Sequence, residues 1–119
     1  MSLQILRKAL EEKVKQPLVT PLEIRRVLLG LGYQRYHDRI RGDLSKMRIR
    51  AIEHGLKAKD YGVYGDSFYT YEVAFNYLRR LEERELISLE GHTELGSLLQ
   101  RAEQNRLSLT DTLSEYRDF

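Results

Sequence analysis

The chain has 119 residues, of which 41% are hydrophobic and 32% are charged, and it carries a net charge of +2. This length and composition indicate a single domain over residues 1–119 and exclude a disordered chain. The chain has no cysteine, which excludes disulfides, thiolate metal sites and cysteine nucleophiles and is typical of proteins in a reducing cytoplasm. No apolar run is long enough to span a bilayer or to form a signal-peptide core, so we expect a cytoplasmic protein that does not contact a membrane.

The charges are segregated along the chain. Residues 33–59 carry eight Lys or Arg against three Asp or Glu, whereas residues 82–119 carry four against nine. This pattern indicates a basic surface for an anionic partner, or an acidic tail that pairs with basic surface in the same chain or in a second copy.

Two helices are predicted before residue 33. The first covers residues 3–14 and ends before Pro17, with a buried stripe formed by Leu3, Leu6, Leu10 and Val14. The second begins with Thr20 as N-cap, Pro21 at the first helical position and Glu23 as the capping-box partner, and Gly30 and Gly32 end it. Its predicted buried stripe is Ile24, Val27, Leu28 and Leu31.

The third predicted helix covers residues 36–57. Gly42 lies in its middle and weakens a helix by about 1 kcal/mol relative to Ala, so a kink or a restart is an alternative to one continuous helix. The predicted core-facing stripe is Tyr33, Tyr36, Ile40, Leu44, Met47 and Ala51. The far side carries a basic row of Arg39, Lys46, Arg50 and Lys57, while Arg41 and Arg48 flank the core-facing stripe.

A third arc of the same helix is apolar. It consists of Ile49, Ile52 and Leu56, so the C-terminal half of the helix needs cover from a second helix or another subunit.

The remaining chain mixes aromatic and helical patterns. Residues 61–71 alternate aromatic side chains around Gly65-Asp66, which favours a short β-hairpin with a two-residue turn, or an ordered loop. Thr70 is expected to cap a helix, and residues 85–91 are expected to form a short strand. Residues 92–119 are predicted to be a C-terminal helical extension, with helices marked by Leu95, Leu98, Leu99 and Ala102 and by Leu109, Leu113 and Tyr116 after Ser108. In the helix capped by Thr70, the predicted buried residues are Val73, Ala74, Tyr77, Leu78 and Leu81.

These patterns predict a mainly α fold, a compact domain of five to six helices with a short β-hairpin or wing. A helix that ends in "LRRLEE" and is followed by a Leu-Ile pair entering a strand, within residues 70–91, resembles the recognition helix and first wing strand of winged-helix DNA-binding domains. The resemblance implies that Asn76, Arg79 and Arg80 approach DNA and that the wing follows Gly91. A third strand is expected to return after the wing, but "TELGSLLQRAEQ" indicates a helix instead.

The main functional hypothesis is a nucleic-acid-binding module, expected to bind DNA as a homodimer and to act as a transcription regulator. A charged helix face that is merely solvated is the plain alternative. Another alternative is a protein-interaction or assembly module without nucleic-acid binding, in which Ile49, Ile52 and Leu56 contact the partner. The predicted nucleic-acid-binding residues are Arg39, Arg41, Lys46, Arg48, Arg50, Lys57, Asn76, Arg79 and Arg80.

Enzymatic patterns are not found, and we predict no catalytic, metal-binding or cofactor-binding residue. "GLGYQR" has Arg35 where a dinucleotide fingerprint needs its third glycine. Glu90, His92 and Glu94 alternate, but one histidine with two glutamates is weak evidence of a metal site. The chain is therefore not expected to be an enzyme.

Overall fold

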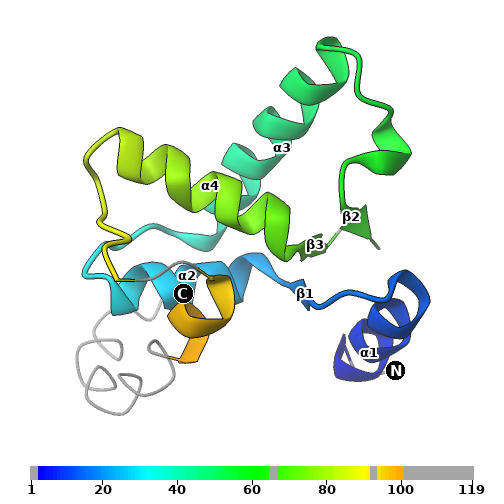
Figure 1. Ribbon diagram of the computed structural model, residues 1–119, viewed down its shortest axis with the longest axis horizontal. Coiled ribbons are helices and arrows are strands. Elements are labelled where there is room, and N and C mark those ends of the chain that lie inside the picture. Colours follow the sequence, from blue (N-terminus) through cyan, green and yellow to red (C-terminus); the bar gives the residue numbers. More distant parts are fainter. Residues whose placement is uncertain (1–2, 65–66, 92–93, 101–119) are drawn as a thin grey trace.

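The computed structural model describes residues 3–64, 67–91 and 94–100, and these residues form helices and short strands (Figure 1). Residues 95–100 are again helical. The prediction of a mainly helical chain with a small hairpin is confirmed. In chain order the elements are α1 (Leu3–Val14), β1 (Leu18–Val19), α2 (Pro21–Gly30), α3 (His37–Glu53), the 3-10 helix η1 (Ala58–Asp60), β2 (Val63–Tyr64), β3 (Phe68–Thr70) and α4 (Tyr71–Glu83).

The three strands form one antiparallel sheet in the order β1-β3-β2. Tyr69 of the central strand lies opposite Val19 on one side and Val63 on the other. The predicted hairpin in residues 61–71 is thus confirmed, although its expected turn at Gly65-Asp66 lies outside the described residues. Strand β1 was not predicted, because two residues are too short to show an alternating pattern.

Helix α2 begins as its sequence predicts. The Thr20 hydroxyl accepts a hydrogen bond from the backbone N–H of Glu23 at 3.2 Å, and the Glu23 carboxylate accepts one from the Thr20 N–H at 3.0 Å. This reciprocal pair satisfies two N–H groups that the first turn of a helix leaves unbonded.

Helix α1 forms where predicted, but its apolar stripe is not buried. Leu6 is 39% exposed, and Leu10 and Val14 are half-buried. Polar contacts hold the helix instead, because the Arg7 guanidinium donates to the Glu23 carboxylate at 2.8 Å. The prediction was wrong because helical spacing identifies an apolar face without showing that a neighbour covers it.

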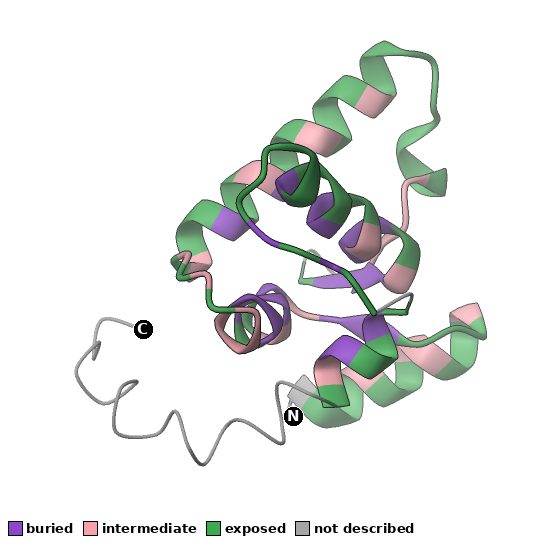
Figure 2. Ribbon diagram, turned by 60° about the vertical axis from the view of Figure 1, so that its left-hand side comes forward, coloured by how far each residue is buried: buried purple, intermediate pink, exposed green. Residues whose placement is uncertain are grey.

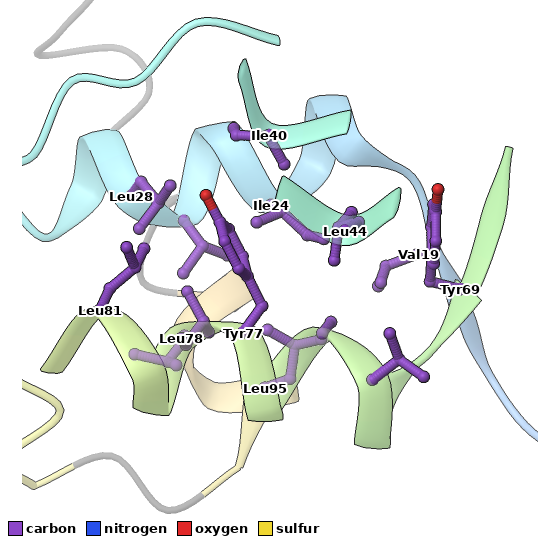
Figure 3. Packing of buried hydrophobic residues seen from close by; sticks show 14 of the residues in the cluster. Val19, Ile24, Leu28, Ile40, Leu44, Tyr69, Tyr77, Leu78, Leu81 and Leu95 are labelled. Carbon is purple, nitrogen blue, oxygen red and sulfur yellow. The ribbon is translucent and has the colours of Figure 1, made fainter. Parts of the chain in front are cut away.

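The core lies between α2, α3, α4 and the sheet (Figure 3). Tyr77 of α4 points into this cluster and is 3% exposed. Figure 2 shows the buried positions of α2, α4 and the sheet facing one another, while the far end of α3 is exposed. The predicted buried residues of α4 are all buried, namely Val73, Ala74, Tyr77, Leu78 and Leu81.

Two predictions about the core are corrected. Tyr36 is 51% exposed, because it precedes α3 in an extended conformation and helical spacing does not apply to it. Residues 85–91 do not form a strand, although Ile87 and Leu89 are buried as an alternating pattern predicts. A strand needs a neighbouring strand to accept its backbone hydrogen bonds, and here the Leu89 N–H donates to the Glu82 carboxylate at 2.6 Å instead.

Part of the predicted C-terminal extension belongs to the core. Leu95 and Leu98 are each 1% exposed and pack into the main cluster. Ala102 and the helix expected after Ser108 lie outside the described residues. In the part of the chain that the structure describes, no helix is long and apolar enough to cross a membrane.

Candidate nucleic-acid interface

Helix α3 is continuous and exposes its cations. Ile40 and Leu44 are buried and Met47 and Ala51 are half-buried, so one side of the helix faces the core as predicted. Gly42 lies within the helix, which shows neither a break nor a restart there. The exposed cations of α3 are Arg39, Arg41, Lys46, Arg48 and Arg50.

A groove of about 940 Å³ lies between α3 and α4 and brings the two predicted sets of residues together. Arg50 lines it from α3, and Asn76, Arg79 and Arg80 line it from α4. A hollow of about 150 Å³ continues along the same helices and shares Met47, Arg50 and Arg80 with the groove. We call the two together the basic groove. Its cations are Arg39, Lys46, Arg50, Arg79, Arg80 and Arg84.

The opposite flank of α3 carries its other two cations. Arg41 and Arg48 line a separate hollow of about 360 Å³ together with Val63 of β2 and Tyr69 of β3. Asp38 is the acidic residue of that hollow. The cations of α3 therefore lie on both sides of the helix, one set toward α4 and one set toward the sheet.

The carboxylate of Asp43, which lines the smaller hollow of the basic groove, is held by three groups. Asp43 accepts a hydrogen bond from the Tyr77 hydroxyl at 2.7 Å, and its oxygens lie 3.2 Å from the Arg35 guanidinium and 3.5 Å from that of Arg39. These contacts tie α4 and the segment before α3 to α3 itself. The negative charge of Asp43 is therefore already paired within the chain. The other carboxylates that line the basic groove are those of Glu53 and Glu83.

The remaining cations of the basic groove are not neutralised within the described residues. Lys46, Arg50 and Arg80 form no salt bridge there. The Arg79 guanidinium lies over the Phe75 ring, 5.2 Å from its centroid, a contact that leaves its charge intact. Their positive charge is therefore free to act on a bound anion.

Tyr61 adds a buried hydroxyl to the wall of the groove. Burial raises the pKa of Tyr61, and the neighbouring Tyr69 raises it further, while Arg80 and Arg48 act in the opposite direction. Within the described part of the chain the hydroxyl has no hydrogen-bond partner. This tyrosine therefore stays neutral at physiological pH and does not offset the charge of the arginines.

One member of the predicted basic row is displaced. Helix α3 ends at Glu53, and Lys57 lies beyond it as the residue that precedes η1. Gly55 adopts a φ of +100°, and the Leu56 N–H donates back to the Ala51 carbonyl at 3.0 Å, which closes the helix end. Lys57 is exposed but does not continue the row, and Leu56 does not continue the helical arc of Ile49 and Ile52.

The apolar arc of α3 remains uncovered. Ile49 is 54% exposed, Ile52 39% and Leu56, beyond the helix, 41%. The described residues of the same chain therefore do not supply the second helix that was predicted to cover this end of α3.

Two residues that matter here were not among the predicted site residues. Arg84 lines the basic groove beside Arg80. It is the residue that follows the end of α4 and lies four residues after Arg80, and this helical spacing is a signal that could have identified it. Arg35 acts indirectly through its contact with Asp43, which no spacing rule predicts because it precedes the helix.

The described residues also include carboxylates and histidines outside the basic groove. No group of three or more His, Asp or Glu side chains there is placed to hold a metal ion. Of the three residues that alternate after residue 89, His92 lies outside the described residues. His37 and Asp38 approach to 3.5 Å, but the Asp38 side chain is 96% exposed, so solvent screens the pair.

Comparisons with known proteins provide no relative for this chain, since no family model, curated protein or solved structure matches it.

Proposed function

We propose that the chain is a DNA-binding module of the winged-helix type, with α3 as the helix that enters the DNA and the β2-β3 hairpin as the wing. The resemblance requires a helix, a strand, a wing and a returning strand in that order. Residues 70–91 supply the helix but not the strand, whereas α3, β2 and β3 supply the helix and the two strands in that order, with Gly65 and Asp66 of the intervening turn outside the described residues. The proposed recognition role therefore moves from α4 to α3, and α4 becomes the second wall of the basic groove.

The observation that carries the proposal is the set of cations on α3 and α4 that form no salt bridge among the described residues. Cations from α3 and α4 line a single groove, and the exposed face of α3 carries further cations toward the hairpin. Rows of cations at helical spacing bind the phosphate backbone and release its counterions. Regulation of transcription and a homodimeric state are parts of the same proposal, since DNA-binding modules of this size commonly act in pairs on two half-sites.

Salt dependence tests the proposal directly. If the five cations of α3 each contact one phosphate, the logarithm of the binding constant should fall with the logarithm of salt with a slope of about −4.5. That slope corresponds to a loss of about 500-fold in affinity between about 50 and 200 mM NaCl. Fluorescence anisotropy with a labelled duplex of mixed sequence measures it.

Reversing the charge of two residues tests whether the basic groove itself, and not the overall charge of the chain, binds DNA. Lys46→Glu with Arg50→Glu should reduce the magnitude of the slope by about 2 and weaken binding at low salt by at least tenfold. The matched control, Lys8→Glu with Lys13→Glu, makes the same change of net charge on exposed positions of α1, which lies away from α3 (Figure 1). Equal effects of the two pairs, or no binding of the native chain to duplex at low salt, would refute the proposal.

A protein-interaction or assembly module is the second candidate, and the exposed Ile49, Ile52 and Leu56 favour it. Such a module should show an oligomer or a captured partner that Ile52→Lys abolishes, with no retention of nucleic acid by the native chain. Light scattering of both proteins, combined with the anisotropy measurement above, decides between the two candidates.

A further inference from the structure

The exposed ridge of α3 consists of Gly42, Ser45, Ile49 and Ile52, and none of these residues is charged. Gly42 and Ile49 are seven residues apart, nearly two helical turns, and so point in the same direction. Ser45 and Ile52 form a parallel row beside them for the same reason. The ridge is therefore small in its first half and apolar and branched in its second.

The ridge lies between two rows of cations. Arg39, Lys46 and Arg50 line the hollow toward α4, while Arg41 and Arg48 line the hollow toward the sheet. A helix with its side chains is about 10–12 Å across, which matches the major groove of B-DNA at about 12 Å. A helix seated in that groove places one row of cations toward the phosphates of each strand and its ridge toward the base edges.

The ridge offers few groups that hydrogen-bond to bases. Ser45 supplies a hydroxyl group to the ridge, and Asp38 and Glu53 supply carboxylates at its two ends. The only apolar group that bases present in the major groove is the 5-methyl of thymine. Ile49 and Ile52, at 54% and 39% exposure, are the side chains on this ridge that match it.

We propose that Ile49 and Ile52 read thymine methyl groups in the major groove, so that the module prefers A·T pairs where the second half of α3 lies. This inference rests on the proposed function and names the feature of the duplex that the site selects. The carboxylate of Glu53, one helical turn from Ile49, disfavours a close phosphate at that end and so keeps the contact on bases rather than on the backbone.

The flanking charges favour DNA over a second copy of the chain as the occupant of this ridge. A two-fold pair of α3 helices would bring the same patch of each copy together. Lys46, Arg48 and Arg50 of one copy would then face the same cations of the other, and α3 as a whole carries five cations against only three carboxylates. Phosphates on both sides of the ridge remove that conflict.

The test compares duplexes that differ only in the methyl group. An alternating A·T duplex and its A·U counterpart carry the same phosphates and the same hydrogen-bonding groups, but the second lacks the 5-methyl. Each buried methyl is worth about fourfold in affinity, so two contacts predict a preference of about 15-fold for the A·T duplex. An alternating G·C duplex should likewise bind more tightly when its cytosines are 5-methylated, because the methyl then occupies the same position in the groove.

Variants assign the preference to the ridge. Ile49→Ala with Ile52→Ala should bind the A·T and A·U duplexes equally, and its salt slope should equal that of the native chain. Leu22→Ala removes an equally exposed apolar side chain from α2, 42% exposed, and should keep the full preference. Circular dichroism checks that each variant is folded.

The outcomes separate this inference from the proposed function. If the affinity depends steeply on salt but not on the methyl group, the proposed contact with thymine is wrong and the proposed DNA binding stands. A native chain that binds no duplex at all overturns both. A loss of oligomer in the double alanine variant, with unchanged affinity for every duplex, overturns the inference and assigns the two isoleucines to a protein contact.

Discussion

Replacing Tyr77 by phenylalanine tests the contact that ties α4 to α3 across the floor of the basic groove. The substitution keeps the buried ring, which is 3% exposed, and removes only the hydroxyl that donates to Asp43 at 2.7 Å. Asp43 retains its contacts with Arg35 and Arg39. A hydrogen bond to a charged group contributes about 1.5–3 kcal/mol. Because the two guanidinium groups still compensate Asp43 in the variant, we expect the free energy of unfolding to fall by only about 1–2 kcal/mol at pH 7.

The same hydroxyl makes the stability depend on pH at the alkaline end. Burial raises the pKa of Tyr77, and the hydrogen bond to Asp43 and the negative charge of that carboxylate raise it further. The folded chain therefore keeps this proton at a pH where the unfolded chain has released it, near the ordinary tyrosine pKa of about 10. The stabilisation is complete below about pH 10 and is lost as the pH rises above it, by about 1.4 kcal/mol for each pH unit.

Together, these two effects predict that the native chain and Tyr77→Phe have the same free energy of unfolding at one alkaline pH. The native chain exceeds Tyr77→Phe by about 1–2 kcal/mol at pH 7, and this difference should vanish near pH 11, where the native chain has lost about 1.4 kcal/mol through this group. Urea unfolding followed by circular dichroism at several values between pH 7 and about 11 measures the difference. Tyr36→Phe, on a tyrosine that is 51% exposed, is the matched control and should change stability by less than about 0.5 kcal/mol. A constant difference between the native chain and Tyr77→Phe across this range would refute the linkage of Tyr77 to Asp43.

Two further predictions concern local backbone and cap geometry, and thermal unfolding measures both. Gly42→Ala should stabilise the chain by about 0.5–1 kcal/mol because the site is helical and open, while Gly55→Ala should destabilise it by about 1 kcal/mol because the backbone there has a φ of +100°. A shift of the same sign in both variants would contradict this assignment. Glu23→Ala should lose about 2 kcal/mol, since Glu23 both closes the capping box with Thr20 and binds Arg7, and Glu23→Gln should recover about half by keeping the cap. Equal loss in the two Glu23 variants would show that the cap contributes nothing.

The elements that the sequence predicted well are those whose signal is local. Thr20 and Glu23 meet within one helical turn, so the start of α2 follows from a few adjacent residues. The buried face of α4 follows from apolar spacing that extends from Val73 to Leu81. In both cases the residues that form the feature are also the residues that reveal it.

The features that the sequence missed depend on partners far along the chain. Strand β1 exists because Leu18 and Val19 find Thr70 and Tyr69 some fifty residues later. The expected strand in residues 85–91 has the right alternation but no neighbouring strand to pair with, and it does not form.

The candidate interface was predicted in composition but not in arrangement. The sorting of cations along α3 follows from helical periodicity alone, but their exposure also depends on which elements pack against the helix. Their meeting with Arg79 and Arg80 in one groove required the placement of α4 against the sheet, which no periodicity contains. Lys57 does not continue the predicted row because the helix closes at Gly55, although the apolar spacing continues to Leu56.

The position of Asp43 explains why the carboxylates of the basic groove are compatible with the proposed binding of an anion. Asp43 lies one helical turn from both Arg39 and Met47 and lines the smaller hollow of the basic groove, where a free carboxylate would repel a phosphate at short range. Its oxygens are instead occupied by the Tyr77 hydroxyl and by two guanidinium groups, so its charge is balanced before any ligand arrives. Removing Tyr77 or Arg35 from this set therefore acts on the interface as well as on stability, because it returns an incompletely compensated negative charge to the place where phosphates are proposed to bind.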